Sequence, residues 1–134
     1  MTKYRNPALT VDTIIIEDNR IVLIKRSNNP YRDHWAIPGG FVEYGEKVED
    51  AAVREAKEET GLDIELTKLV GVYSDPDRDP RGHTVTVAYT AKIVGGTLQS
   101  DSDAKDARFI SPDELENIDL AFDHCVILKD ADIL

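Results

Sequence analysis

Three glutamates near the middle of the chain are spaced for one face of a helix. Glu55, Glu58 and Glu59 stand three and four positions apart in the segment REAKEETGL. At about 100° per residue, their carboxylates point to the same side of a helix. Four apolar residues lie within about 60° of Glu55 on the same helical wheel: Val48, Ala51, Ala52 and Leu62. We therefore expect the glutamates on the side of the helix that packs against the rest of the protein.

Carboxylates in such a position require positive charge close by. Three acidic groups on an inward face repel one another and lose hydration, which costs on the order of several kcal/mol unless cations compensate them. Arg54 and either Lys25 or Arg26 are candidates for part of this charge. Oxygen ligands near an open cleft suit Mg²⁺, which keeps some waters and shares its coordination with substrate phosphates. We interpret the cluster as a Mg²⁺ site, with Mn²⁺ as the alternative metal; the competing interpretation is a solvated acidic helix face.

The residues before the glutamates predict the elements that position them. Residues 9–16 and 21–26 are β-branched apolar runs separated by four polar residues, which predicts a β-hairpin. After a polar loop, a short segment at 35–37 leads into Pro38, Gly39 and Gly40. Glycines allow a backbone to approach a ligand closely, so this turn is predicted to face the ligand.

The helix that carries the glutamates is predicted from residue 47 to about residue 60, because this stretch is rich in helix formers. Gly61 follows where a left-handed helix terminator is expected. Residues 64–73 and 84–94 then predict two strands, and a turn at Gly95 and Gly96 ends the second. Alternate residues of the second strand share one face: Val85, Val87, Tyr89, Ala91 and Ile93.

The C-terminal part opens with a helix-start signature. Ser111 is a capping residue, Pro112 occupies the first helical position, and Glu114 stands three residues after the cap. Short terminal helices are predicted to follow. The chain shows no repeat, low-complexity tract or linker. The order of strands, one long helix, strands and short helices predicts a single α+β domain over residues 1–134.

Composition limits the possible partners. With 26 acidic and 16 basic residues the formal charge is −10, which disfavours binding to a nucleic-acid polymer. No apolar stretch is long enough for a spanning helix, and no signal peptide is evident, so we expect a cytoplasmic protein that binds no membrane. The single cysteine, Cys125, forms no internal disulfide, and the histidines show no zinc-ligand spacing.

The glutamate segment carries a resemblance to a known family. The chain contains the arrangement G-x5-E-x7-R-E-A-x-E-E-x-G-L over residues 40–62. Its fixed positions are Gly40, Glu46, Arg54, Glu55, Glu58, Glu59 and Gly61. This arrangement resembles the complete Nudix box. The resemblance implies an α/β/α sandwich around a mixed β-sheet, in which the box forms a loop, a helix and a loop.

The resemblance also implies a reaction and roles for individual residues. Nudix hydrolases use water to cleave nucleoside diphosphates linked to another moiety. By resemblance, Glu55, Glu59 and the carbonyl of Gly39 are metal ligands, and Glu58 is a further ligand or holds a water on the metal. Arg54 and Glu46 are implied to form an ion pair that orients the site. A metal so placed screens phosphate charge and lowers the pKa of the attacking water.

The general base is the least constrained role. Nudix proteins often take it from the loop after the third long strand, and residues 99–108 of that predicted loop contain Asp101, Asp103 and Asp106. We choose Asp103, with a glutamate of the box as the rival. The alternative is that these aspartates belong to an ordinary solvated loop.

Substrate choice must come from outside the box. Residues 74–86 and 39–46 resemble the corresponding regions of Nudix ADP-ribose pyrophosphatases. Arg78 and Arg81 are candidates to contact a second phosphate or ribose hydroxyls, and His83 is a candidate for the same cleft. Their alternative is a charged hairpin loop.

Two further features lie apart from these segments. Arg26 matches a position at which Nudix enzymes often contact the nucleotide. The alternative is an ordinary arginine on the protein surface. The run AFDH at 121–124 also occurs at this place in related Nudix sequences. We expect it to pack a helix, and we assign His124 no catalytic role.

Three hypotheses of function follow. The first is an ADP-ribose pyrophosphatase that yields AMP and ribose 5-phosphate, and the second is a hydrolase of ordinary or oxidised nucleoside triphosphates. The third is a sensor domain that binds a sugar nucleotide without cleaving it. The complete box disfavours the sensor, and motifs of other hydrolase classes are absent from the sequence. A homodimer is compatible with the exposed edges of a small sheet.

Overall fold

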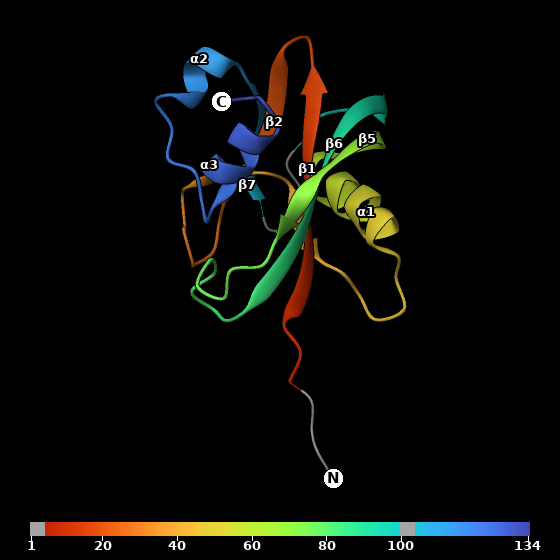
Figure 1. Cartoon of the computed structure of the whole chain (residues 1–134). Coiled ribbons are helices and arrows are strands. Elements are labelled where there is room, and N and C mark those ends of the chain that lie inside the picture. The colour runs from red at the N-terminus through yellow and green to blue at the C-terminus, as the bar shows by residue number, and fades with distance from the viewer. Residues whose placement is uncertain (1–4, 100–103) are drawn as a thin grey trace.

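The computed structural model describes residues 5–99 and 104–134. Its strands are β1 (Ala8–Glu17), β2 (Arg20–Arg26), β3 (Trp35–Ala36), β4 (Gly39–Phe41), β5 (Leu62–Tyr73), β6 (Thr84–Gly96) and β7 (Ala104–Ile110). Its helices are α1 (Val48–Thr60), α2 (Pro112–Leu115) and α3 (His124–Asp130). Figure 1 shows α1 on the opposite side of the central strands from α2 and α3.

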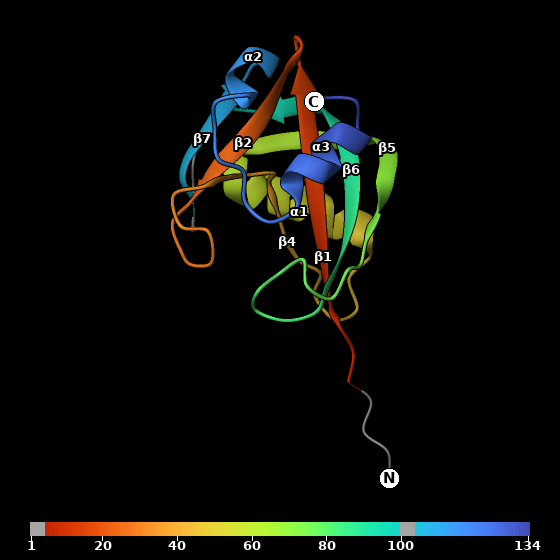
Figure 2. The ribbon, with the colours of Figure 1, turned by 60° about the vertical axis from the view of Figure 1, so that its left-hand side comes forward.

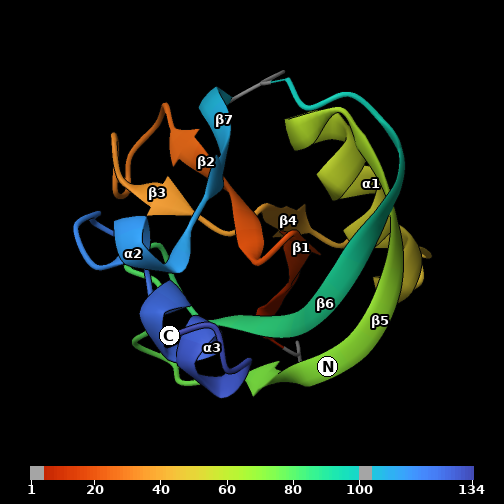
Figure 3. The ribbon, with the colours of Figure 1, turned by 90° about the horizontal axis from the view of Figure 1, so that it is seen from above.

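The sheet is mixed and is built around β1. The strand order is β3-β2-β1-β6-β5, with β4 paired to β1 and β7 paired to β2. β1 and β6 run parallel, whereas the other pairs are antiparallel. Seen from above in Figure 3, β5 and β6 curve around α1, and α2 and α3 lie between β6 and the β2–β7 pair. The predicted α+β sandwich with a mixed sheet is confirmed.

β1 is buried on both faces, which explains its nearly continuous apolar sequence. Ile14 packs with Leu115, Ile127 and Leu128 under the C-terminal helices. On the other face, Val11 packs with Ala51 and Ala52 of α1. Alanines on α1 let the helix lie close to the sheet, so the position of its glutamates is fixed by packing against β1.

The ends of α1 agree with the sequence prediction. Lys47 is the residue before the first helical turn, and Gly61 has a φ of 76° in the left-handed region. The N–H of Gly61 donates to the carbonyl of Lys57, which closes the last turn. An added Cβ on Gly61 would also overlap the carbonyl of Thr97, so the position excludes a side chain on two grounds.

The other local predictions are mostly confirmed. Asp18 and Asn19 have positive φ angles of 51° and 61°, typical of a tight two-residue turn between antiparallel strands, so the hairpin forms as expected. Ser111 and Glu114 form the predicted capping box. Within the described residues, no helix combines the length and apolar character needed to cross a bilayer.

One strand was missed. Residues 104–108 were predicted as part of a loop, but they belong to β7, which pairs antiparallel with β2. Its sequence, AKDARFI, contains too many charged residues to predict a strand. The pairing with β2 supplies the stabilisation that the local sequence lacks.

Candidate active site

A cleft of about 480 Å³ opens beside the N-terminal half of β1. Its lining comes from β1, β2, β4, α1, the loop between β5 and β6, and the start of α3. Figures 1 and 2 show that the loops after β2, β4 and β5 all reach the end of the sheet at which β1 begins. The volume suits a ligand of nucleotide size.

The structure brings most of the predicted site residues into this cleft. Seven of them line it: Arg26, Gly39, Glu55, Glu58, Glu59, Arg78 and Arg81. Glu46 and Arg54 lie behind the glutamates instead, and His83 is not part of the lining. Asp103 and Asp101 lie outside the described residues. Asp106 is in β7, where its carboxylate accepts a hydrogen bond from Arg108 at 2.7 Å, away from the cleft lining.

The three glutamates of α1 are not equivalent. Glu55 and Glu59 are partly buried, as the inward face predicts. Glu58 is different, since its side chain is 53% exposed, so the prediction that all three lie on the packed side was wrong for Glu58. Glu58 lies at the rim of the helix face, where it still lines the cleft but keeps contact with solvent.

Arg54 holds the acidic groups together from one side. Its Nε lies 2.8 Å from Glu46 Oε2, and its Nη1 lies 2.8 Å from Glu55 Oε1 and 3.3 Å from Glu58 Oε2. The predicted Arg54–Glu46 ion pair is therefore present. The hydrogen bond from Arg54 lowers the pKa of Glu46 to about 2. The hydrogen bonds that Arg54 donates to Glu46, and then those to Glu55, raise the pKa of Arg54, whereas loss of hydration works against this shift. Arg54 thus stays charged and fixes one oxygen of Glu55.

The protein compensates the charge of the two inner glutamates only in part. Burial, more than any neighbouring group, raises the pKa of Glu55. Burial followed by the charge of Glu55 raises the pKa of Glu59 well above its ordinary value. The N–H of Gly39 donates to Glu59 Oε1 at 3.1 Å, which offsets only part of this cost. A divalent cation between these oxygens would offset the rest, so the donor set fits Mg²⁺ or Mn²⁺.

The glutamates are not arranged as a finished cage. Within residues 5–99 and 104–134, no three acidic, histidine or cysteine side chains converge closely enough to enclose a metal by themselves. This is consistent with a Mg²⁺ site of the open kind, in which waters, backbone carbonyls and substrate oxygens complete the coordination. Gly40 leaves room for the carboxylate of Glu55, which a Cβ at this position would overlap.

Two arginines also line the cleft. Arg26 donates from Nε to the carbonyl of Pro30 at 2.8 Å, and its guanidinium lies 5.0 Å from the ring centroid of Phe122. Burial, and then the charge of Arg81, lowers the pKa of Arg26. Arg81 pairs with the buried Asp79 at 2.7 Å. Its guanidinium lies 5.4 Å from the ring centroid of Phe41 and 5.5 Å from that of Phe122. Both arginines can attract an anionic ligand.

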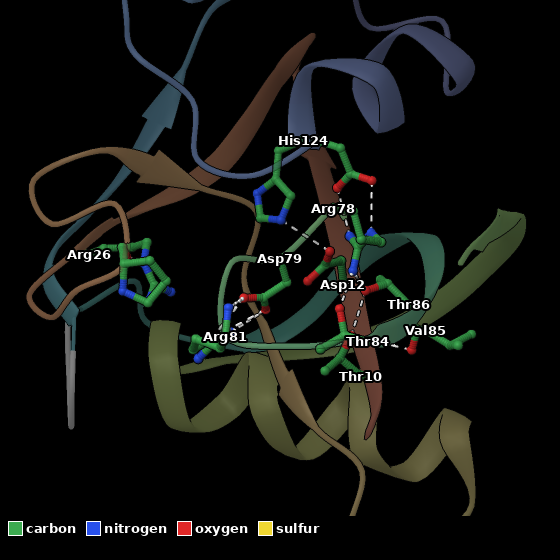
Figure 4. Close-up of polar contacts among 12 residues, drawn as sticks. Thr10, Asp12, Arg26, Arg78, Asp79, Arg81, Thr84, Val85, Thr86 and His124 are labelled. Atoms are coloured by element: carbon green, nitrogen blue, oxygen red, sulfur yellow. Dashed lines mark hydrogen bonds and ion pairs between the residues drawn. The ribbon is translucent and has the colours of Figure 1, made fainter. Parts of the chain in front are cut away.

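Arg78 is engaged inside the protein rather than free for a ligand. Its side chain is only 5% exposed and forms two bonds to Asp123, at 2.8 Å from Nε and 2.6 Å from Nη2. Its Nη1 donates to the hydroxyls of Thr84 and Thr86 (Figure 4). These bonds give Arg78 a structural role, and its contact with a phosphate stays a prediction. Arg78 ties the loop after β5 to β6 and to the N-terminus of α3.

His83 also has a partner outside the cleft. Its Nε2 lies 2.9 Å from the carbonyl of Ser74, at the opposite end of the same loop. This contact closes the base of the loop that carries Asp79 and Arg81. The cleft lining gives no support to the predicted contact between His83 and substrate.

Sequence reasoning missed several lining residues. These are Asp12 on β1, Asp79 in the β5–β6 loop, and Phe122 and His124 around the start of α3. His124 was assigned no role, yet it is buried, and its ring contacts both Asp12 and the backbone of Ile37. The sequence did contain one signal for this pair. Asp12 interrupts the apolar run of β1, and a buried carboxylate needs a partner.

Comparison with known proteins places the chain in a family. The family model described as NUDIX domain matches residues 6–130. The chain is 54% identical over 127 residues to an ADP-ribose pyrophosphatase of Methanocaldococcus jannaschii, and the match covers 95% of this chain and 74% of that protein. It is 36% identical over 135 residues to the ADPR responsive transcriptional repressor NtrR of Acinetobacter baylyi, covering 96% of this chain but 54% of the repressor.

A solved structure has a similar fold. The NUDIX domain of Shewanella oneidensis NrtR, complexed with ADP ribose, superposes with a TM-score of 0.84 at 29% identity. The match covers 96% of this chain and 88% of that one. Since the family model spans nearly the whole chain and the box lies in the cleft, this chain belongs to the NUDIX domain family.

Proposed function

We propose that this protein is a Mg²⁺-dependent hydrolase that cleaves ADP-ribose into AMP and ribose 5-phosphate, with Mn²⁺ able to replace Mg²⁺. The observation that carries the proposal is the cleft itself. Its lining combines the inner glutamates of the box with two arginines, Arg26 and Arg81. The 54% identical relative named as an ADP-ribose pyrophosphatase supports this substrate.

Water supplies the nucleophile in this reaction. Its oxygen bonds to one of the two phosphorus atoms as the bridging P–O bond breaks, so each product leaves with one phosphate group. A bound divalent cation would screen the phosphate charge and lower the pKa of the attacking water. Glu55, Glu59 and the Gly39 carbonyl are the groups that would hold the cation.

The surrounding residues contribute position and charge. Arg54 fixes Glu55 through the 2.8 Å bond, so that oxygen does not have to reorganise when the cation binds. Asp103 is the proposed general base, and Glu58, which is exposed and lines the cleft, is its rival for taking a proton from water. Arg26 and Arg81 attract the diphosphate, and the rings of Phe41 and Phe122 lie beside these guanidinium groups.

The direct test is product release from a substrate panel with and without Mg²⁺. The panel contains ADP-ribose, ADP-glucose, a dinucleotide, and ordinary and oxidised nucleoside triphosphates. Fast, Mg²⁺-dependent formation of AMP from ADP-ribose is the expected result. Preference for a triphosphate would instead indicate a hydrolase of ordinary or oxidised nucleoside triphosphates. Binding of ADP-ribose without any cleavage would indicate a sensor, the class to which the 36% identical repressor belongs.

Replacing one glutamate tests the assignment of the metal ligands. Glu59→Gln keeps the size of the side chain and removes its charge, so turnover is expected to fall by about 100-fold or more while the fold is retained. The matched control is Glu65→Gln, since Glu65 is 64% exposed on β5 and outside the cleft. Unchanged turnover in Glu59→Gln would refute the metal assignment.

A further inference from the structure

Asp12 is a carboxylate on the wall of the cleft that the box does not include. It lies in β1, directly opposite Gly39 of β4 in the strand register, and is only 7% exposed. A Cβ added to Gly39 would overlap Asp12 Oδ1, so this oxygen lies against the Gly39 backbone. The N–H of the same glycine donates to Glu59. Asp12 and Glu59 therefore approach the backbone of one residue from two elements.

His124 holds the other oxygen of Asp12. The N–H of Ile37 donates to His124 Nδ1 at 3.0 Å, so Nδ1 is an acceptor and the ring proton is on Nε2. Nε2 lies 3.2 Å from Asp12 Oδ2, the contact drawn as a dashed line in Figure 4. His124 is itself 4% exposed, so its ring has little freedom to turn. A fixed tautomer thus orients the carboxylate of Asp12.

The remaining oxygen of Asp12 faces the cleft. Among residues 5–99 and 104–134, Oδ1 receives no hydrogen bond and forms no ion pair. In the same described residues, Thr13 Oγ1 is the buried side-chain atom that lacks a partner, so Asp12 Oδ1 keeps contact with solvent in the cleft, where a cation or its bound water can reach it. The negative charge of Asp12 also acts on Glu59, which makes a cation between them more favourable.

We propose that Asp12 contributes a further carboxylate to the divalent-cation site at Gly39 and Glu59, directly or through a water molecule, and that His124 is the residue that positions it. This inference rests on the proposed metal-dependent function. It goes beyond the box, because both residues lie outside residues 40–62. A purely structural role for the pair would leave cation affinity unchanged when Asp12 is neutralised.

Cation binding is measured on the full chain without nucleotide, by titrating Mn²⁺ and detecting the free ion by electron paramagnetic resonance. Asp12→Asn keeps the volume of the side chain and removes its charge. We expect it to weaken Mn²⁺ binding about 10- to 100-fold, the range typical when a group that supports a metal site is removed. The matched control is Asp63→Asn, which breaks an exposed ion pair with Lys57 away from the cleft and is expected to leave Mn²⁺ affinity unchanged.

Two substitutions of His124 separate its two contacts. Glutamine places an amide N–H near the position of Nε2, so His124→Gln keeps the donor to Asp12 and loses the acceptor for Ile37. Asparagine places an oxygen near Nδ1, so His124→Asn keeps the acceptor and loses the donor. We expect Mn²⁺ affinity near the wild-type value for His124→Gln and a loss similar to that of Asp12→Asn for His124→Asn. Circular dichroism in chelator confirms that each variant is folded.

The outcomes are distinguishable. Wild-type protein that binds no Mn²⁺ would overturn both the proposed function and this inference. If the wild type binds Mn²⁺ and Asp12→Asn binds it with equal affinity, only this inference is overturned, and Glu55 and Glu59 remain as ligands. If Asp12→Asn keeps Mn²⁺ affinity but loses affinity for AMP in chelator, the carboxylate faces nucleotide hydroxyls and the inference is also overturned. Should Asp12→Asn fail to fold, the Mn²⁺ affinities of His124→Asn and His124→Gln decide whether the inference holds.

Discussion

At the scale of single residues, the cleft depends on close contacts between the backbone of two glycines and the carboxylates of acidic side chains. Gly39 donates to Glu59, and both Gly39 and Gly40 lie against acidic side chains, from Asp12 and Glu55 respectively. A Cβ at Gly40 would displace the Glu55 carboxylate, whereas a Cβ at Gly39 would overlap both Asp12 Oδ1 and the backbone carbonyl of Val11. Neither glycine has a φ in the left-handed region, so close contacts rather than turn geometry require them.

Gly40→Ala is expected to lower Mn²⁺ affinity and turnover together, by about 10-fold or more, because its Cβ would push the Glu55 carboxylate aside. The control is Gly71→Ala on β5, where an added Cβ makes only ordinary contacts with Tyr73. Binding of Mn²⁺ and steady-state kinetics measure the effect. Wild-type affinity in Gly40→Ala would contradict the proposed place of Glu55 in the site.

At the scale of elements, the loop between β5 and β6 is anchored at both of its ends. His83 contacts the carbonyl of Ser74 at the base of the loop, and Arg78 reaches Asp123 at the start of α3. Because Arg78 is buried, its bonds to Asp123 are shielded from water and contribute more than a surface ion pair would. The loop presents Arg81 and Asp79 to the cleft from this anchored position.

Arg78→Met is expected to lower the free energy of unfolding by about 3–5 kcal/mol, because it leaves the carboxylate of Asp123 without its partner. The double variant Arg78→Met with Asp123→Asn should recover part of this loss, since no buried charge remains unpaired. Lys92→Met is the matched control, because Lys92 and its partner Glu65 are both exposed, at 58% and 64%. Urea denaturation measures all of these. Equal losses for the Arg78 and Lys92 variants would refute the anchoring role.

At the scale of the whole molecule, an acidic chain holds a cluster of carboxylates that are costly to ionise. The formal charge is −10, and the pKa values of both Glu55 and Glu59 are raised in the folded protein, chiefly by burial. A carboxyl with a raised pKa binds its proton more tightly when folded than when unfolded. Its contribution to stability is present below the ordinary pKa near 4.5 and is lost as pH rises through the folded value.

The stability of the metal-free protein relative to Glu59→Gln should therefore decline as pH rises above about 4.5, since the variant carries no proton to lose there. Mg²⁺ should reverse this trend in the wild type, because it binds the ionised form, and should have little effect on the variant. At about 100 times its dissociation constant a ligand adds about 2.7 kcal/mol of stability. Thermal denaturation across pH, in chelator and in Mg²⁺, checks the prediction. Parallel pH profiles for the two proteins in chelator would contradict it.

The sequence by itself determined the features that depend on nearby residues. The glutamate spacing, the terminator at Gly61 and the capping box at Ser111 all involve positions within four residues of each other. Helix periodicity and backbone preferences act at that range, so a pattern of residue types is sufficient to predict them. The hairpin of β1 and β2 was predicted for the same reason, whereas the Arg54–Glu46 pair was implied by the resemblance to the Nudix box.

Only the tertiary structure decided the contacts between distant segments. Arg78 and Asp123 are separated by 45 residues, and Ile37 and His124 by 87. No local preference indicates that these groups meet, so the sequence predicted Arg78 as a substrate contact and gave His124 no role. The charged strand β7 was missed for the same reason, because its stabilisation comes from pairing with β2. The fold brings Asp12 and His124 together because β1 lies at the centre of the sheet and α3 covers one of its faces.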